Sequence, residues 1–584
     1  MSSFFQKYQK YKSKYLGGRR KLKRENEFVK EMDQRSIIVF GENYSAEYTK
    51  EGAGDPRVTF FFKIVRGLPR DQINLYVKSI LQLYDETGDR NVFLDLFVIM
   101  FHSRDIRGGK GERDIFYEMM IELYENYPEI ILELLALVPY YGYYKDYFRM
   151  MEMVGHVHNS FTARIYELVA GQLNLDTAAL DRAKEGVPKI SLLAKYIPKE
   201  HKYFDQVYRF VEHISKILYP EVKDMNEQKR LYRLQVSALN KALGTAEVLM
   251  SARKFAEINF SKLASKATFK YRKAFLNIGV DKNTERSIEE DRKKARDNFL
   301  KAIRDKKISG KQLEIYEIAK IVKEDMDQKI TKEEVSLFQV QWDKIRENLL
   351  KQLGTEIDLA NLLPIADVSG SMFGMPMYVS VSLSLLLSEI SKTFADRIVT
   401  FSETPEWIKL DRNADVVTKM RQVFAAPFGL NTNFEAVYDM IIDVVRSKKL
   451  EEKDIPDLIV FSDMQFDLAA TPERYKTHHQ IIVEKFQNVG IEISGKPYKI
   501  PRIIYWNLRA DTIGFPVQAN TPNVEMISGF SPNLLKHILG GNISKGFKII
   551  TPYETLRNIL DDDRYAIIRE ITNAEIKKLK NVTP

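Results

Sequence analysis

Apolar residues recur at helical spacing through most of the chain between about residues 55 and 350. One example places five of them on a single helical face: Ile73, Tyr76, Val77, Ile80 and Leu81. A helix repeats about every 3.6 residues, so this spacing predicts an amphipathic helix. Pro139 and Gly142 end a later apolar run, as helix breakers do. Long helices with short breaks favour stacked helix pairs, an α-solenoid, although no clean sequence period accompanies them.

Short apolar runs alternate with amphipathic stretches from residue 355 onward. The predicted strands are 362–367, 397–402, 458–463, 502–507 and, more weakly, 524–528. The predicted helices are 376–394, 434–447, 471–488 and 551–560. This alternation predicts a doubly wound parallel sheet. The expected fold class is α plus α/β, in three parts: a basic N-terminal arm at 1–50, a helical-repeat domain at 51–354 and a doubly wound domain at 355–584.

Composition narrows the class of protein. An apolar content of 44% and a charged content of 29% are typical of soluble globular proteins. The longest apolar run, residues 92–100, is too short to cross a membrane and contains Asp95. The first residues have no apolar core of a signal peptide. The chain has no cysteine, which excludes disulfides and thiolate zinc sites. We therefore expect a cytoplasmic protein without membrane contact, with the nucleus or a virion as alternatives.

Positive charge is concentrated before residue 355. Residues 355–584 hold 26 Lys and Arg against 29 Asp and Glu, whereas the rest of the chain holds 63 against 51. The first 24 residues alone carry nine Lys and Arg, with three tyrosines among them. A basic surface points to a polyanion, most often nucleic acid. A solvated helical surface is the alternative, and the basic arm could equally serve as a nuclear address or a contact arm.

Polar residues follow two of the predicted strands. Asp367-Val368-Ser369-Gly370-Ser371 ends the strand 362–367, and Asp463 ends the strand 458–463. In an open parallel sheet, ligands bind beyond the carboxyl ends of the strands. Two carboxylates and nearby hydroxyls would form a hard-oxygen site suited to Mg²⁺ or Mn²⁺, with coordination positions left for water or a partner's carboxylate. Two strand-end carboxylates that cap helices are the alternative.

This pattern resembles the metal-ion-dependent adhesion site of von Willebrand factor type A domains. Asp367, Ser369 and Ser371 match its Asp-x-Ser-x-Ser loop, Thr432 matches its lone threonine, and Asp463 matches its distal aspartate. The resemblance implies that Ser369 and Ser371 bind the ion directly. It implies that Asp367 and Asp463 bind directly or through water, and that Thr432 engages according to conformational state.

A glycine-rich segment at residues 102–114 has three glycines within four residues, flanked by cations. We expect a tight turn between helices that exposes backbone amides and positive charge. It is not a Walker loop, because the Gly-x-x-x-x-Gly-Lys-Ser/Thr pattern is absent. The candidate polyanion contacts are Arg104, Arg107, Lys110 and Arg113. The alternative is a structural turn whose arginines pair with the acidic residues beside them.

A second basic stretch spans residues 262–273. Its candidate contacts are Lys262, Lys266, Lys270 and Lys273. Lys266, Lys270 and Lys273 are spaced at i, i+4 and i+7, so they share one helical face. A stripe of like charge costs stability unless an anion lies opposite. A solvated lysine face is the alternative interpretation.

Several segments together resemble the Ro-like family that carries the DUF2828 domain, which is similar to the TROVE module of the Ro autoantigen. They are 102–114, 139–146, 263–271, 461–467 and 528–531, although Leu263-Ala264 replaces the family's usual Val-Pro. The resemblance spans roughly residues 55–570. It implies a HEAT-like ring or horseshoe joined to a von Willebrand type A domain. In Ro proteins the ring's basic face and hole bind structured RNAs and the single-stranded ends of misfolded RNAs, and the ring is usually monomeric.

The expected function is therefore a non-catalytic RNA-binding protein of Ro type, with a metal site for a second partner that presents an acidic group. A metal-dependent protein–protein scaffold, or a structural component such as that of a virion, is the first alternative. A metal-dependent nuclease or phosphatase is the second. Against the latter, no second carboxylate pair marks a two-metal site in the sequence.

Overall fold

The computed structural model describes most of the chain. The described residues are 27–155, 159–183, 188–279, 281, 284–310, 313–325, 329–354, 361–427, 429, 431–468, 475–540 and 550–582. Residues 1–26, which hold most cations of the predicted basic arm, lie outside the described residues.

Helices fill the described chain from Lys50 to Leu353. In order they are α3 (Lys50–Ala53), α4 (Pro56–Lys63), α5 (Arg70–Thr87), α6 (Arg90–Arg104), α7 (Asp114–Asn126), α8 (Pro128–Leu134), α9 (Val138–Tyr141), α10 (Lys145–Val154), α11 (Asn159–Arg182), α12 (Leu193–Tyr196), α13 (Tyr203–Tyr208), α14 (Phe210–Leu218), α15 (Met225–Leu243), α16 (Ala246–Ser251), α17 (Ser265–Phe275), α18 (Glu290–Arg304), α19 (Tyr316–Glu324) and α20 (Lys332–Leu353). The predicted face of α5 is buried at Ile73, Tyr76, Val77 and Ile80, and Gly88 ends the helix in the left-handed conformation.

Strands and helices alternate after residue 361, as predicted. The strands are β3 (Leu362–Asp367), β4 (Arg397–Phe401), β5 (Glu406–Lys409), β6 (Asp457–Ser462), β7 (Ile503–Asn507) and β8 (Val524–Ser528). The helices are α21 (Met375–Ile390), α22 (Val416–Phe424), α23 (Phe434–Lys448), α24 (His478–Ser494), α25 (Leu535–Gly540), α26 (Pro552–Leu560) and α27 (Ala566–Val582). The sequence missed the short strand β5 and the helices α22, α25 and α27. It also began α24 too early.

The six strands form one sheet in the order β5-β4-β3-β6-β7-β8. Neighbours run parallel, except that the edge strand β5 runs antiparallel to β4. The first strand of the sheet, β3, therefore lies beside the fourth, β6, and the chain winds outward from this pair in both directions. Such a switch point opens a crevice at the carboxyl ends of the two central strands.

A short hairpin precedes the helical part, within the segment predicted to be a basic arm. After α2 (Glu27–Ser36), β1 (Ile38–Phe40) pairs with β2 (Ala46–Tyr48). Backbone hydrogen bonds in both directions join Tyr48 to Phe515, at 2.9 and 3.0 Å, so the hairpin packs on the sheet domain. The arm boundary predicted at residue 50 therefore differs from the structure, in which residues 38–48 are folded.

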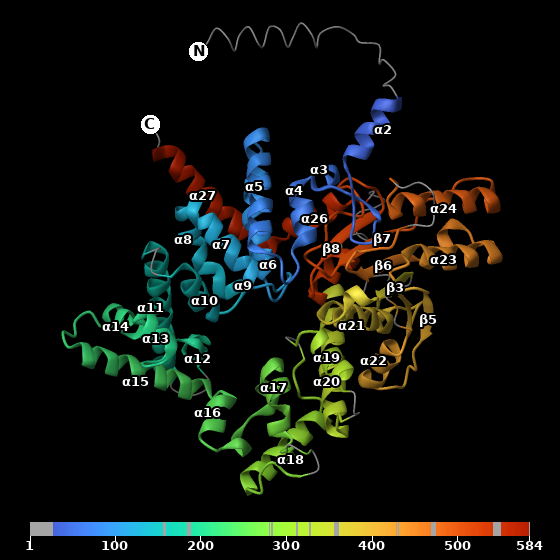
Figure 1. Cartoon of the computed structure of the whole chain (residues 1–584). Helices are drawn as coiled ribbons and strands as arrows, with labels where there is room; N and C mark the ends of the chain where they lie inside the picture. Colours follow the sequence, from blue (N-terminus) through green and yellow to red (C-terminus); the bar gives the residue numbers. More distant parts are fainter. Residues whose placement is uncertain are drawn as a thin grey trace, which may run out of the picture.

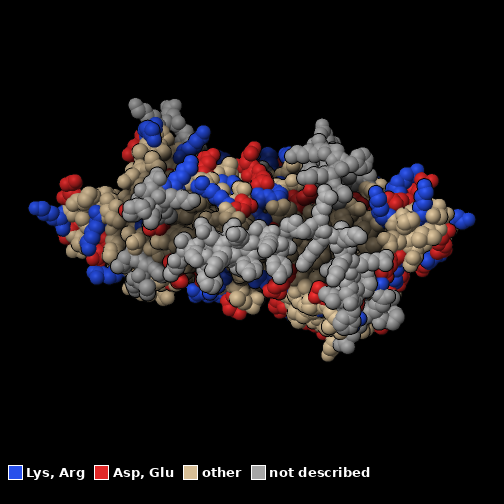
Figure 2. Space-filling model, turned by 90° about the horizontal axis from the view of Figure 1, so that it is seen from above, with Lys and Arg blue, Asp and Glu red and all other residues tan. Residues whose placement is uncertain are grey.

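The helices follow one another around an open centre, and the sheet domain completes the circle (Figure 1). At one join, α19 and α20 pack on α21 and α22. At the other, α4, α6 and α8 pack on β8, α26 and α27. Seen from above, the molecule is much wider than it is thick (Figure 2). Within the described ranges, no helix is both long and apolar enough to cross a membrane.

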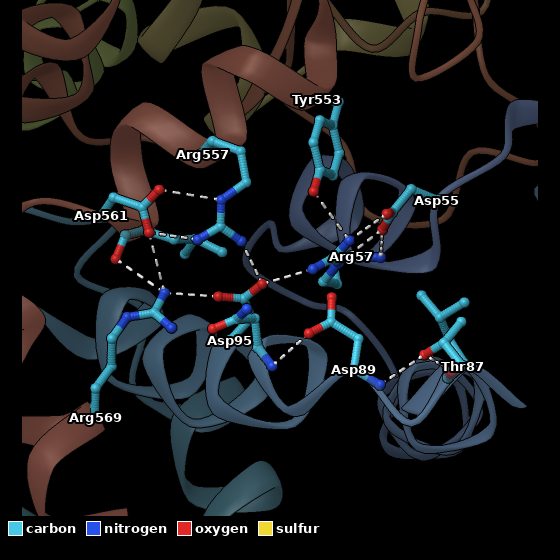
Figure 3. A network of polar contacts seen from close by, with 12 residues as sticks. Asp55, Arg57, Thr87, Asp89, Asp95, Tyr553, Arg557, Asp561 and Arg569 are labelled. Atoms are coloured by element: carbon cyan, nitrogen blue, oxygen red, sulfur yellow. Dashed lines mark hydrogen bonds and ion pairs between the residues drawn. The ribbon is translucent and has the colours of Figure 1, made fainter. Parts of the chain in front are cut away.

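A buried ion network holds the second of these joins together (Figure 3). Asp95 on α6 is fully buried and accepts hydrogen bonds from three arginines. Arg57 on α4 lies 2.7 Å from its carboxylate, Arg569 on α27 lies 2.6 Å away, and Arg557 on α26 supplies the third. The three guanidiniums offset the large cost of burying one carboxylate, and they tie the first helices to the last.

Replacing Asp95 tests this join. Asp95→Asn keeps the side-chain shape but removes the charge that three arginines share. Breaking a buried ion pair from one side costs roughly 3–5 kcal/mol. We expect a loss near the lower value, about 3 kcal/mol, seen as a lower midpoint of urea unfolding. The exposed Asp71→Asn is the control. Equal midpoints for the two variants would show that the network does not stabilise this join.

Candidate metal site and central cavity

Both predicted aspartates lie at the switch point of the sheet. Asp367 ends β3, and Asp463 directly follows β6. The parallel register pairs Ala366 with Phe461, so the two strand ends lie side by side. Both carboxylates are fully buried. The structure thus brings the two aspartates together at one edge of the sheet.

The serine loop after β3 surrounds the Asp367 carboxylate. The backbone N–H of Ser369 donates to Asp367 Oδ1 at 2.9 Å. The hydroxyl of Ser462, the residue before Asp463, donates to Asp367 Oδ2 at 2.6 Å. The Oγ atoms of Ser369 and Ser371 lie 3.2 Å apart. The predicted serines are therefore gathered next to the first aspartate, and Ser462 joins them from the neighbouring strand.

Thr432 reaches the same edge from the loop before α23. The backbone N–H of Gly370 donates to the carbonyl of Gly429 at 3.0 Å, which holds this loop against the serine loop. The N–H of Thr432 donates to Asp467 Oδ2 at 2.8 Å. Its own Oγ1 is buried and has no hydrogen-bond partner in the described part of the chain. The backbone thus fixes the threonine while its hydroxyl oxygen remains available.

Asp463 leaves a second buried oxygen available. Its Oδ1 accepts the N–H of Gln465 at 3.1 Å, and the carboxylate also takes a hydrogen bond from the Ser371 side chain. Its Oδ2 is buried without a hydrogen-bond partner among the described residues. Arg509 Nη1 lies 3.7 Å from that oxygen, too far for a hydrogen bond.

The electrostatics of this edge favour a cation. Burial, together with repulsion from Asp463, raises the pKa of Asp367 to about 7. Burial also raises the pKa of Asp463, against the opposing effect of the Ser371 hydrogen bond. Two buried carboxylates side by side are unfavourable while both are charged. A divalent cation would neutralise them and would use the available oxygens of Thr432 and Asp463.

The donor set fits a hard cation such as Mg²⁺ or Mn²⁺, because it consists of carboxylate and hydroxyl oxygens. Nowhere in the described ranges do three or more His, Cys, Asp or Glu side chains gather as a metal-binding group. A site here would therefore depend on the hydroxyls of Ser369, Ser371 and Thr432 as well as on the two aspartates.

Two candidate cations of the glycine-rich segment are buried. Lys110 Nζ donates to the carbonyls of Phe61 and Ile64 and to the hydroxyl of Ser528 at the end of β8, at 2.5–3.2 Å. Burial lowers the pKa of Lys110 well below its usual value. Arg104 is buried against Asp146 at 2.8 Å. Both side chains are thus used inside the protein, and the partner of Arg104 is Asp146, 42 residues further along the chain, rather than an acidic residue of the turn itself.

The other two cations of this segment are exposed. Arg107 is exposed, and its Nη1 donates to the Tyr140 carbonyl. Arg113 is exposed at the start of α7. At position 109 of the turn only glycine fits, because a Cβ there would lie 2.1 Å from the carbonyl oxygen of His102. The turn therefore serves the close packing of α6 on the following residues.

The predicted lysines of the second stretch are exposed on and beside α17. They are Lys262, Lys266, Lys270 and Lys273. Lys266 has an anion opposite, because its Nζ lies 2.6 Å from Glu314. Lys270 lies 5.0 Å from the centre of the Tyr271 ring. Lys266 and Lys270 both line a hollow in the helical part.

This hollow is a central cavity of about 950 Å³. Its walls come from the turn before α7 and from α10, α12, α16, α17, α19 and α20, with residues 531–533 of the sheet domain. The cations in the lining are Arg66, Arg104, Lys110, Arg113, Lys145, Arg149, Lys195, Lys266 and Lys270. The acids are Asp114, Asp146, Glu152, Glu247, Glu314 and Glu317. Arg104 and Lys110 are buried, and without them seven cations still stand against six acids. The lining is therefore net positive, and it also contains five tyrosines: Tyr117, Tyr143, Tyr196, Tyr271 and Tyr316.

Part of this positive charge is already paired within the protein. Arg66 pairs with Glu112 at 3.0 Å, and Lys195 pairs with Glu247 at 3.1 Å. By contrast Arg113, Lys145 and Lys270 are exposed and form no ion pair with any described residue. On the outer face seen in Figure 2, Lys and Arg lie among Asp and Glu rather than in one basic field. Cations thus outnumber acids in the cavity lining, whereas the two kinds of charge are mixed on the face seen in Figure 2.

Sequence reasoning missed three residues at the metal-site edge. Ser462 is adjacent to Asp463 and could have been noticed as a polar residue at the end of an apolar strand. Glu42 and Arg509 carry no local signal, because they come from segments more than 400 residues apart. Only the folded chain brings them to Asp463.

Both parts of the chain are similar to known protein families. Residues 155–355 match the family model of a domain of unknown function, DUF2828, and residues 361–564 match that of another, DUF7788. An uncharacterized protein of Acanthamoeba polyphaga mimivirus is 28% identical over 545 residues, which cover 88% of each chain. The similarity thus extends across the helical part and the sheet domain together. The resemblance to the DUF2828 family inferred from the sequence is confirmed for residues 155–355.

Proposed function

We propose that the protein is an RNA-binding ring of Ro type, which holds single-stranded RNA in its central cavity. The observation that carries the proposal is the lining of the cavity. It has a net positive charge, three cations without described ion-pair partners, and tyrosines at several points of its wall. Proteins that bind single strands combine cations that follow the phosphates with aromatic rings that stack on bases.

The size and position of the cavity agree with this proposal. Its volume of about 950 Å³ lies at the upper end of the range for ligand pockets, roughly 300–1,000 Å³. Tyr143, Tyr196 and Tyr271 are half-buried in its wall, so each ring is partly open to a ligand. Arg113, Lys145 and Lys270 come from three different elements of that wall. A strand in the cavity could therefore be contacted from several sides.

We further propose that the helical part is a HEAT-like solenoid and that the sheet domain is of von Willebrand factor type A. The strand order, with an antiparallel edge strand, and the polar residues at the switch point support the second assignment. In this proposal Asp367, Ser369, Ser371, Thr432 and Asp463 hold one Mg²⁺ or Mn²⁺. The bound ion would supply an open coordination position for an acidic group of a protein partner. The proposal is for a binding protein, acting as a monomer, rather than for an enzyme.

Charge reversal in the cavity tests RNA binding. The triple variant R113E/K145E/K270E should bind a fluorescein-labelled single-stranded RNA roughly 100-fold more weakly than the natural sequence. Loss of three phosphate contacts accounts for this factor, and it should also flatten the salt dependence by about two in log–log slope. Fluorescence anisotropy at several salt concentrations measures both.

The control variant K78E/K223E/K294E reverses three exposed lysines that do not line the cavity. Its affinity should stay within a few-fold of the unaltered protein. Equal losses in the two triple variants would show that RNA contacts the surface through general charge alone. Unchanged affinity in the cavity variant would exclude the cavity as the binding site.

Replacing Asp367 tests the metal site. The folded state raises the pKa of Asp367 from 3.8 to about 7, so it binds more protons than the unfolded state between these values. Metal-free stability should therefore fall as pH rises from about 4 to about 7. Asp367→Asn removes the buried charge and should unfold at a higher temperature than the natural sequence at pH 8 in EDTA, but not at pH 4.

The same variant should lose the rise in unfolding temperature that Mg²⁺ or Mn²⁺ produces in the unaltered protein. The exposed Asp443→Asn is the matched control and should keep that rise. If Asp367→Asn responds to the metal as the unaltered protein does, the ion binds elsewhere.

A further inference from the structure

Arg509 lies beside Asp463, one of the proposed metal ligands, but is not itself among the predicted ligands. It follows β7, and its backbone N–H donates to Asn507 Oδ1 at 3.0 Å. Its guanidinium lies 2.6 Å from Asp511 and 3.7 Å from the Asp463 oxygen that has no hydrogen-bond partner in the described chain. About a quarter of the side chain is exposed, at 26%. A positive charge is therefore already present beside one of the two metal-binding carboxylates.

The N-terminal segment holds this arginine in place. Arg509 donates to both carboxylate oxygens of Glu42, at 3.2 and 3.3 Å. The backbone N–H of Glu42 donates to Gln465 Oε1, and Asn43 Nδ2 donates to the Gln465 carbonyl, each at 2.9 Å. Tyr44 forms a β-bridge with Asp467. Residues 42–44 are thus bound to the loop that carries Asp463, both directly and through Arg509.

Gln465 links this segment to the interior of the site. It is buried, and its Nε2 has no hydrogen-bond partner in the described ranges. Its backbone N–H donates to Asp463 Oδ1, while its side-chain carbonyl accepts from Glu42. The same residue therefore contacts the metal-binding carboxylate on one side and the N-terminal segment on the other.

We propose that Arg509 is a resident counter-cation of Asp463, which lowers the affinity of the site for divalent metal and couples the site to the N-terminal segment. The inference rests on the proposed metal site. A divalent ion and a guanidinium on the same carboxylate repel each other, more strongly at a buried position than in water. The bound metal displaces Arg509 from Asp463 and weakens the contacts that Arg509 and Gln465 make with residues 42–44. Coupling of this kind is reciprocal, so the docked segment opposes metal binding.

Isothermal titration of Mn²⁺ into the full-length protein tests the first half of the proposal. Arg509→Gln should bind Mn²⁺ roughly 10-fold more tightly than the unaltered protein, within the usual range of such couplings. Arg509→Lys keeps the positive charge and should stay close to the unaltered affinity. Asp463→Asn should remove binding in either background. Equal tightening by the glutamine and lysine variants would contradict a role for the charge.

Hydrogen exchange tests the second half. Saturating Mn²⁺ should speed amide exchange in residues 38–48 of the unaltered protein and leave it unchanged in Asp463→Asn. Slower or unchanged exchange in the unaltered protein would overturn the coupling. If no Mn²⁺ binding depends on Asp463, even with Arg509→Gln, the metal site itself is wrong. If binding depends on Asp463 but not on residue 509, the metal site stands and the counter-cation proposal fails.

Discussion

Two buried aspartates, Asp95 in the first half of α6 and Asp105 directly after its end, hold the first helices against the last. Asp95 forms ion pairs with Arg57 near the start of the chain and with Arg557 and Arg569 near its end. Asp105, also fully buried, takes Arg564 at 2.9 Å and the Tyr565 hydroxyl at 3.1 Å. Burying these charges is costly, and only partners in the correct geometry offset the cost. The network therefore favours one way of joining the first helices to the last, and the cavity depends on that join.

The carboxyl edge of the sheet serves two purposes. At β7 and β8 it belongs to the join: Asn507 donates to the Phe62 carbonyl at 3.1 Å, and Ser528 donates to that of Phe61 at 2.7 Å. At β3 and β6 it forms the proposed metal site. Arg509 links the two parts of this edge, because it follows Asn507 by two residues and lies 3.7 Å from Asp463. A cation at the metal site would thus lie on the same edge that fastens the ring.

Local sequence patterns were enough to predict the sheet and its polar edge. An apolar run that ends in Asp367 or Asp463 predicts a strand, and the aspartate marks the carboxyl end of that strand. The helical part followed from periodicity in the same way. The edge strand β5 escaped notice because Glu406–Lys409 is short and half-exposed, so its pattern is weak. Elements with a clear apolar pattern over a few consecutive residues were predictable.

Residues whose role depends on distant partners were not predictable. Lys110 looks like a surface cation in sequence, yet its charge is buried against carbonyls of α4 and a serine more than 400 positions away. Asp95 looked like a polar interruption in an apolar run, but its arginines come from the last helices of the chain. Sequence reveals the charge of such residues but not what folds against them. For the same reason, the sequence did not predict that Glu42 and Arg509 lie beside the proposed metal site.

Photocrosslinking of a single-stranded RNA to the full-length protein, with mass spectrometry of the attached peptides, tests the central claim most directly. Simple exposure would favour Tyr140 and Tyr203, which are 55% and 69% exposed and do not line the cavity. A ring that holds RNA in its centre predicts crosslinks at Tyr143, Tyr196 or Tyr271 instead. Crosslinks confined to Tyr140, Tyr203 or other residues outside the cavity lining would contradict the account.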